Sequence, residues 1–252
     1  TPARDALLSF GTQKIGRGWG YGLHEAMDQI GATIGPLLVS AVLFYQHQNY
    51  QIAFGILVIP AIIAVSILLY CRQLYPKPEN LEIKTTSITS KSLPERYWIY
   101  TLAAVFIAAG YVDFPLIAYH FKQRAIMSDS VIPLFYSIAM ATDAIAALIL
   151  GKMYDKIGIK TLMLAVLLSA FFAPMVFLGG FNWALAGMML WGIGMGAQES
   201  ILKAAVAGMV PPEKRGTAFG TFNTAYGLFW FAGSALMGYL YDFSVKGVIL
   251  VS

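Results

Sequence analysis

Acidic side chains occur inside long apolar stretches of this sequence, where a charged group needs a chemical reason. They are Glu25, Asp28, Asp113, Asp143 and Glu199. Carboxyls inside a membrane span are costly, and they usually face a cavity, an ion pathway or a partner group. A carboxyl in that setting can bind a proton or a cation. These residues are therefore the candidates for substrate binding or proton coupling.

Glu25 and Asp28 lie one turn apart on a predicted helix, and Ala32 and Gly35 continue the same face. A polar stripe with small residues on an otherwise apolar helix indicates a cavity wall. Either acid can bind a proton or a cationic substrate there. The alternative is that both pair with Arg or Lys near the cytoplasmic mouth and act as a gate or scaffold.

Asp113 precedes Pro115 in one apolar stretch, and Asp143 lies inside the next. Neither has a basic residue three or four positions away, so its partner must be another helix, water or a bound proton. Both are candidates for coupling or substrate binding, and the alternative is hydrogen bonding to Ser, Thr or Tyr. Glu199 differs because Lys203 follows it at i+4, the favourable order for an intrahelical ion pair.

Long apolar helices must position these carboxyls. The chain has 252 residues, of which 58% are hydrophobic and 12% charged, whereas soluble domains carry about 25% charged residues. A spanning helix needs about 20 apolar residues. The stretches of that length are 19–45, 51–71, 97–119, 130–151, 160–179, 183–209 and 216–241, and a shorter apolar run covers 248–251. We predict an all-α membrane protein.

A polar stretch over residues 72–96, rich in Pro, Ser and Thr, separates two groups of predicted helices. We predict that residues 1–71 are the end of an N-terminal half with two transmembrane helices. Residues 72–96 are then a cytoplasmic linker, and 97–252 form a C-terminal half with five helices and the start of a sixth. The chain begins with Thr1 rather than Met, so we expect it to begin partway through a longer protein, with the N-terminal half incomplete.

The basic residues fall mainly on one side of the predicted membrane. Alternate loops hold Arg4, Lys14, Arg17, Arg72, Lys77, Lys84, Lys91, Arg96, Lys152, Lys156, Lys160, Lys214 and Arg215, against Lys122, Arg124 and Lys246 on the other side. Lys and Arg accumulate in cytoplasmic loops. We therefore expect loops 1–18, 72–96, 151–160 and 211–216 on the cytoplasmic side of the cell membrane. The same bias accounts for the net charge of +4 without a nucleic-acid partner.

The sequence contains an internal repeat. Residues 17–22 read Arg-Gly-Trp-Gly-Tyr-Gly and residues 215–220 read Arg-Gly-Thr-Ala-Phe-Gly, 198 positions later. The same offset carries Gly35 onto Gly233. Unless this short match is chance, it indicates two related halves in parallel order, as in many transporters.

A second motif connects two predicted spans. It consists of Gly151, Asp155, Lys156, Gly158 and Lys160. This pattern resembles the Gly-x-x-x-Asp-Arg/Lys-x-Gly-x-Arg/Lys signature of the major facilitator superfamily, found between the second and third helices of each half. The alternative is a short basic turn between any two helices.

The resemblance implies a major facilitator-type helical bundle of two pseudo-symmetric halves. It also implies that the chain runs from the end of the fourth helix into the twelfth, with roughly the first four helices absent. By the same resemblance, Asp155 contacts the N-terminus of the helix that Arg17 and Gly18 begin.

Residues 31–36 carry a third motif, in Gly31, Gly35 and Pro36. It resembles the Gly-x-x-x-Gly-Pro segment in the fifth helix of family members that work as antiporters. The family's further glycines are replaced here by residues 37–40, Leu-Leu-Val-Ser. The two glycines predict close helix packing, and the surrounding stretch is also similar to bacterial drug-efflux-like permeases.

The resemblance implies a secondary active transporter that moves a small organic solute by alternating access. Proton-coupled efflux by antiport is the favoured interpretation, and a solute–proton symporter for uptake is the alternative. From another class, a membrane-embedded enzyme or a structural membrane protein remains as an alternative. We expect no enzyme activity, cofactor or metal site, because no phosphate loop, His-Glu-x-x-His motif or nucleophile–base set occurs. The expected partners are the substrate, protons and the lipid bilayer, with the protein as a monomer.

Overall fold

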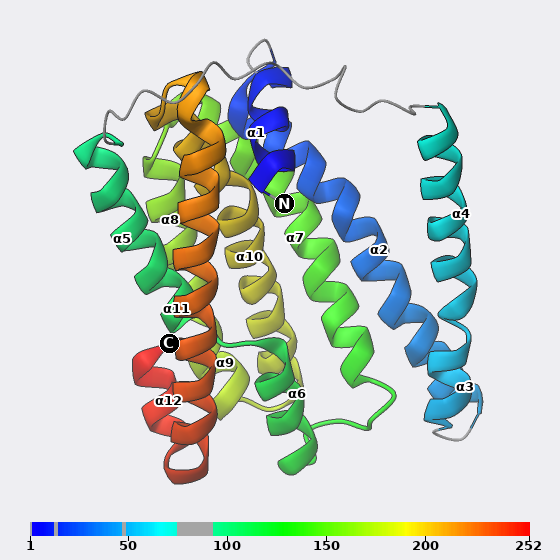
Figure 1. Cartoon of the computed structure of the whole chain (residues 1–252). Helices are drawn as coiled ribbons and strands as arrows, with labels where there is room; N and C mark the ends of the chain where they lie inside the picture. The colour runs from blue at the N-terminus through cyan, green and yellow to red at the C-terminus, as the bar shows by residue number, and fades with distance from the viewer. Residues whose placement is uncertain (1, 13–14, 47–48, 75–92) are drawn as a thin grey trace.

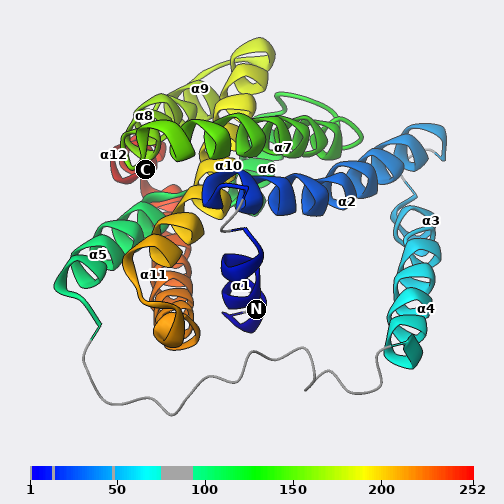
Figure 2. The same ribbon diagram turned by 90° about the horizontal axis from the view of Figure 1, so that it is seen from above.

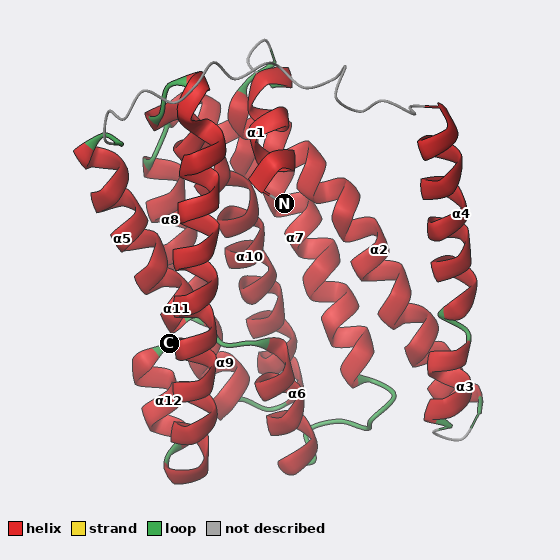
Figure 3. Cartoon of the chain, viewed as in Figure 1, coloured by secondary structure: helices red, strands yellow, loops and turns green. Residues whose placement is uncertain are grey.

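The structure, a computed structural model, describes residues 2–12, 15–46, 49–74 and 93–252. These residues form helices and turns, and no strand occurs among them (Figures 1 and 3). The predicted all-α fold is therefore confirmed. The helices are α1 (Pro2–Gly11), α2 (Arg17–Tyr45), α3 (Tyr50–Gly55), α4 (Val58–Leu74), α5 (Glu95–Gly110), α6 (Phe114–Gln123), α7 (Ile132–Ile157), α8 (Lys160–Ser169), α9 (Phe172–Leu178), α10 (Phe181–Met209), the 3₁₀ turn η2 (Pro212–Lys214), α11 (Arg215–Phe243) and α12 (Val245–Val251).

In the described part of the chain, five helical segments are long and apolar enough to cross a membrane. They are Arg17–Tyr45, Tyr50–Tyr70, Glu95–Gln123, Ile132–Ile157 and Lys160–Leu178, which match five of the predicted stretches. Helices α10 and α11 have 29 residues each, or roughly 43 Å at 1.5 Å per residue. They exceed a bilayer core in length, and their membrane crossing stays a prediction.

One of these segments is broken at residues 111–113, between α5 and α6. A break inside a membrane leaves backbone groups that need other partners. Trp191 of α10 supplies one of them, because its indole N–H donates to the Val112 carbonyl at 2.8 Å. The Trp191 carbonyl also accepts from the side-chain hydroxyl of Tyr111. The break is therefore fixed against α10.

Two expected loops are largely helical. Residues 1–18 contain α1, which buries Asp5, Ser9 and Thr12 on one face. Residues 151–160 contain the last turns of α7, which continues to Ile157 and ends at Gly158 with a φ of 65°. Glycine adopts this left-handed conformation without strain. Most of the predicted linker lies outside the described residues.

The helix boundaries reproduce the repeat found in the sequence. The offset of 198 residues carries Arg17 and Tyr45, the ends of α2, onto Arg215 and Phe243, the ends of α11. It also carries the last residue of α1 onto the last residue of α10. The pairs α1–α2 and α10–α11 therefore have the same register.

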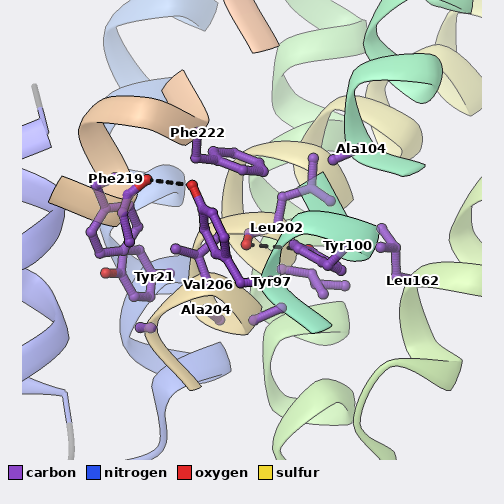
Figure 4. Close-up of a cluster of buried hydrophobic side chains, with 14 of the residues drawn as sticks. Tyr21, Tyr97, Tyr100, Ala104, Leu162, Leu202, Ala204, Val206, Phe219 and Phe222 are labelled. Carbon is purple, nitrogen blue, oxygen red and sulfur yellow. Dashed lines mark hydrogen bonds between the residues drawn. The ribbon is translucent and has the colours of Figure 1, made fainter. Parts of the chain in front are cut away.

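A buried cluster near one end of the bundle joins α2 to later helices. Tyr21 of α2 packs with Tyr97 and Tyr100 of α5 and with Phe219 and Phe222 of α11, beside residues of α8 and α10 (Figure 4). The two α5 tyrosines also donate hydrogen bonds to carbonyls of α11 and α10, at 2.9 and 3.2 Å. Apolar burial and satisfied hydroxyls together fix the relative position of these helices.

The helix ends sort by charge along the bundle. The starts of α2, α5 and α11 and the turn between α7 and α8 lie at one end, the upper end of Figure 1. The end of α6, which carries Lys122 and is followed by Arg124, and the start of α12, which carries Lys246, lie toward the other end. Helix α4 lies at the edge of the bundle in both ribbon views (Figures 1 and 2), with its apolar side chains exposed as expected beside lipid.

Candidate functional site

Close backbone contact between α2 and α7 determines where the candidate acids lie. A Cβ atom added to Gly18 or Gly22 of α2 would collide with the backbone of α7 at Gly151 or Ala147. Both helices carry these small residues four positions apart, the spacing that lets membrane helices approach closely. The side chains that follow on α2 are thereby held against α7.

One turn further along α2, Glu25 and Gln29 meet Asp143 of α7. The Gln29 amide nitrogen donates to the Glu25 carboxyl at 2.7 Å and to the Asp143 carboxyl at 3.0 Å. All three side chains are buried, and Asp143 has no exposed surface. A single amide therefore links two carboxyls from two helices in the interior of the bundle.

Helix α10 adds a third carboxyl to this cluster. Glu199 lies close enough to Glu25 for the two carboxyls to interact, and the Lys203 ammonium lies 3.9 Å from the Glu199 carboxyl. Gly196 makes room for this arrangement, because a Cβ atom there would meet the Asp143 carboxyl oxygen at 2.9 Å. That oxygen is buried without a hydrogen-bond partner.

The cluster thus contains three carboxyls and one ammonium group. We define the acid cluster as Glu25, Gln29, Asp143, Glu199 and Lys203. Like charges close together in a water-poor interior repel, and binding a proton or another cation relieves that repulsion. The acid cluster can therefore take up and release a cation.

Asp113 lies outside the acid cluster. It precedes α6 at the break in the span, and its two carboxyl oxygens accept hydrogen bonds from the Trp230 indole and the Ser234 hydroxyl of α11. Both oxygens have a donor, so the carboxyl holds the break against α11 and needs no further partner.

An apolar cavity of roughly 360 Å³ lies beyond the acid cluster along α2 and α7. Gly35 and Pro36 of α2 line it together with Phe114 and Tyr136. Tyr136 lies seven residues before Asp143 on α7, so the two side chains share a face of that helix, two turns apart. An organic molecule in the cavity would therefore have the acid cluster about two turns away along this face of α7, while Tyr50 of the cavity wall donates a hydrogen bond to Asp129.

Asp155 contacts the start of α2, as the sequence resemblance implies. Its carboxyl oxygens accept hydrogen bonds from the backbone N–H groups of Gly18 and Trp19, each at 2.8 Å. The N-terminus of a helix carries unpaired N–H groups and a partial positive charge, so a carboxylate is stabilised there. The preceding Gly16 has a φ of 98° and leaves space that a Cβ atom would take from Asp155.

Comparison with known proteins identifies the family. A sequence model described as Major Facilitator Superfamily matches residues 1–234. The chain belongs to the Major Facilitator Superfamily.

The sequence is also similar to two uncharacterised proteins. An uncharacterised protein of Mycobacterium tuberculosis (strain ATCC 25618 / H37Rv) is 34% identical over 256 residues, covering 99% of this chain and 63% of the relative. An uncharacterised MFS-type transporter of Methanocaldococcus jannaschii is 28% identical over 266 residues, covering 99% and 64%. The chain thus spans less than two thirds of the length of these relatives. No solved structure matches.

The other candidate residues of this superfamily member lie apart from the acid cluster. Asp28 is half exposed and pairs with Arg4 at 3.4 Å and with His24 at 3.5 Å. Around Gly31 and Gly35, no other side chain or backbone of the described residues lies within 4 Å of where a Cβ would be. The predicted role of this motif in helix packing has no contact to support it among these residues.

Lys156, Gly158 and Lys160 complete the superfamily signature at the end of α7 and the start of α8.

Gln29 is the member of the acid cluster that the sequence analysis missed. The signal was present, because Gln29 is a polar residue in an apolar stretch, four positions after Glu25. Among the described residues, no group of three or more His, Cys, Asp or Glu side chains is placed to hold a metal ion.

Proposed function

We propose that the protein is a secondary active transporter that moves a small organic solute by alternating access, with proton coupling at the acid cluster. Membership of the superfamily supports this proposal, as does the printed name of the M. jannaschii relative, an MFS-type transporter. The chain spans 63–64% of those relatives, so the activity of the whole protein stays a proposal.

The observation that carries the proposal is the origin of the carboxyls. Glu25 comes from α2, before the proposed linker over 72–96, and Asp143 and Glu199 come from helices after it. The acid cluster therefore bridges the two proposed halves, 1–71 and 97–252. If these halves move against each other, the distances among the carboxyls change, and so does their affinity for a proton.

Antiport is the favoured mode because substrate and proton would share one site. A cationic group of a molecule that extends from the apolar cavity along α7 to Asp143 would compete with a proton for the same carboxyls. Alternate occupation by the two exchanges them across the membrane. When protons enter the cell down their gradient, this exchange exports the solute.

Proton movement in proteoliposomes tests this function. The protein at its full natural length would be reconstituted and screened with a library of small organic molecules, while a trapped dye reports internal pH. We expect substrate-dependent proton flux in the wild type and in Asp113→Asn, and flux at the level of protein-free liposomes in Asp143→Asn. Asp113 is the matched control because it is a carboxyl within the bundle that lies outside the acid cluster.

The direction of the two fluxes separates the alternatives. Opposite movement of solute and protons supports antiport, and parallel movement supports symport. Solute movement without proton flux, unchanged in Asp143→Asn, would contradict coupling at the acid cluster.

A further inference from the structure

A polar cavity of roughly 500 Å³ lies at the basic end of the bundle, away from the acid cluster. Its wall contains the backbone of residues 207–212, where α10 ends, and three arginines from the starts of three helices. These are Arg17 of α2, Arg96 of α5 and Arg215 of α11. Three positively charged guanidinium groups around one cavity repel one another, and a bound anion would reduce this repulsion.

Arg215 is the buried member of this set, with 2% of its surface exposed. One terminal nitrogen donates to the Ser9 carbonyl and hydroxyl at 3.3 and 3.1 Å, and the Phe10 ring lies 5.2 Å from the guanidinium carbon. Its Nε is buried and has no hydrogen-bond partner among the residues that the structure describes. These neighbours are neutral, so they do not offset the positive charge of the Arg215 guanidinium.

Carboxylates do not balance the three arginines. Among the residues that the structure describes, none lies within 4.0 Å of a guanidinium nitrogen of Arg17, Arg96 or Arg215, whereas other acids of the chain do form such pairs. Glu213 acts on Arg215 from a greater distance, and Arg17 repels it. A buried charge without a paired counterion is unfavourable, so this cavity has a reason to hold an anion.

We propose that this cavity binds a phosphate group, the chemistry shared by an anionic phospholipid head group and a soluble phosphate. Arginine presents paired N–H donors that match phosphate oxygens. The N-terminus of α11 adds its positive dipole end at the same place. Occupation would join α2 to α5 and α11, and thereby the two proposed halves, at their basic end.

The test measures binding to the full-length protein after delipidation in detergent. One arm uses native mass spectrometry with palmitoyl-oleoyl phosphatidylglycerol, with phosphatidylcholine as the competitor. The other arm uses calorimetry with inorganic phosphate. The variant Arg17→Gln/Arg96→Gln removes two guanidinium groups that make no hydrogen bond or ion pair with other described residues, so the fold should survive. Arg124→Gln, at the opposite end of the bundle, is the matched control.

We expect one bound equivalent in the wild type and in Arg124→Gln, and affinity at least about tenfold weaker in the double variant, since each lost guanidinium removes charge-assisted hydrogen bonds. Retention of phosphatidylglycerol against phosphatidylcholine identifies a lipid head group, and binding of inorganic phosphate alone identifies a soluble ligand. Equal binding of both probes by all three proteins, or no binding by the wild type, would overturn the proposal.

Discussion

Asp113 and Asp143 are both aspartates of apolar spans, and their surroundings differ in kind. Asp113 accepts hydrogen bonds from Trp230 and Ser234 on both oxygens. Asp143 shares one amide donor with Glu25, and its other oxygen is buried with no hydrogen-bond partner in the described part of the chain. The first carboxyl is satisfied by donors, while the second is surrounded by other acids.

This difference teaches that burial of a charge does not by itself identify a coupling site. A carboxylate with enough fixed donors contributes to the architecture, because its charge is already stabilised. A carboxylate among other carboxyls is unstable without a cation, and its occupancy depends on distances that a conformational change can alter. By this criterion we propose that Asp143 belongs to the transport chemistry and Asp113 to the scaffold.

The largest effect should come from the contact that holds the acid cluster together. Gly22→Leu places a side chain against the α7 backbone, so we expect a loss of about 3 kcal/mol or more of stability and loss of proton coupling. Gly31→Leu is the control, because no side chain or backbone of the described residues outside its own turns lies within 4 Å of a Cβ there. Thermal unfolding followed by size-exclusion chromatography measures the stability of both variants, and proton flux in proteoliposomes measures their coupling. Equal destabilisation by the two variants would refute the proposed role of the α2–α7 contact.

Substitution of the two aspartates should change the stability of the fold differently. Asp113→Ala leaves the Trp230 and Ser234 donors without an acceptor, and we expect it to cost about 1 to 3 kcal/mol. Asp143→Asn removes one charge from a repelling group, so stability should stay unchanged or rise. Midpoints of chemical denaturation in the same detergent compare them. A larger loss for Asp143→Asn than for Asp113→Ala would break the distinction between the two sites.

A smaller effect is expected where Asp155 stabilises the start of α2. Asp155→Ala removes the acceptor of two backbone N–H groups and should cost about 1 kcal/mol. Asp155→Asn keeps one of the two acceptors and loses the other together with the charge, so its cost should be smaller. The same denaturation measurement ranks the two variants. The reverse order would mean that an amide nitrogen facing the second N–H group costs more than the loss of both acceptors.

The smallest effect concerns the opposite end of the bundle. Asp129 accepts hydrogen bonds from Lys122 at 2.8 Å and from Tyr50 at 3.1 Å. The Lys122 ammonium holds the pKa of Asp129 below its usual value. A depressed pKa stabilises the fold above the unfolded pKa of about 3.9, and this contribution is lost as pH falls through the folded value.

Because this pair is exposed, its effect should be small and should weaken further in salt. The unfolding temperature of the wild type should therefore fall slightly more between pH 6 and about pH 3 than that of Lys122→Gln. Identical pH profiles would show that the pair contributes nothing to stability.

Much of the architecture could be predicted from the sequence. Runs of apolar residues located five segments that the structure also shows as long apolar helices, and the repeat of residues 17–22 at 215–220 predicted the equivalent register of α2 and α11. These features are local or periodic, so they can be recognised in a single chain. The signature around Asp155 was equally local.

The partners of the acids could not be predicted. Helical periodicity placed Glu25 and Asp28 on one face, but α7 and α10 cover only part of α2, so Glu25 is buried while Asp28 is half exposed. The link from Gln29 to Asp143 joins residues 114 positions apart. It depends on the approach of two helices, which no pattern within either helix specifies.

The most direct test of proton binding at the acid cluster is infrared spectroscopy of the carboxyl groups during a pH titration. Protonated carboxyls absorb at a frequency distinct from that of carboxylates, and the measurement needs no identified substrate. If the acid cluster binds the coupling proton, a titrating carboxyl band is present in the wild type, persists in Asp113→Asn and is lost or strongly shifted in Asp143→Asn. A band that disappears in Asp113→Asn and is unchanged in Asp143→Asn would contradict the assignment.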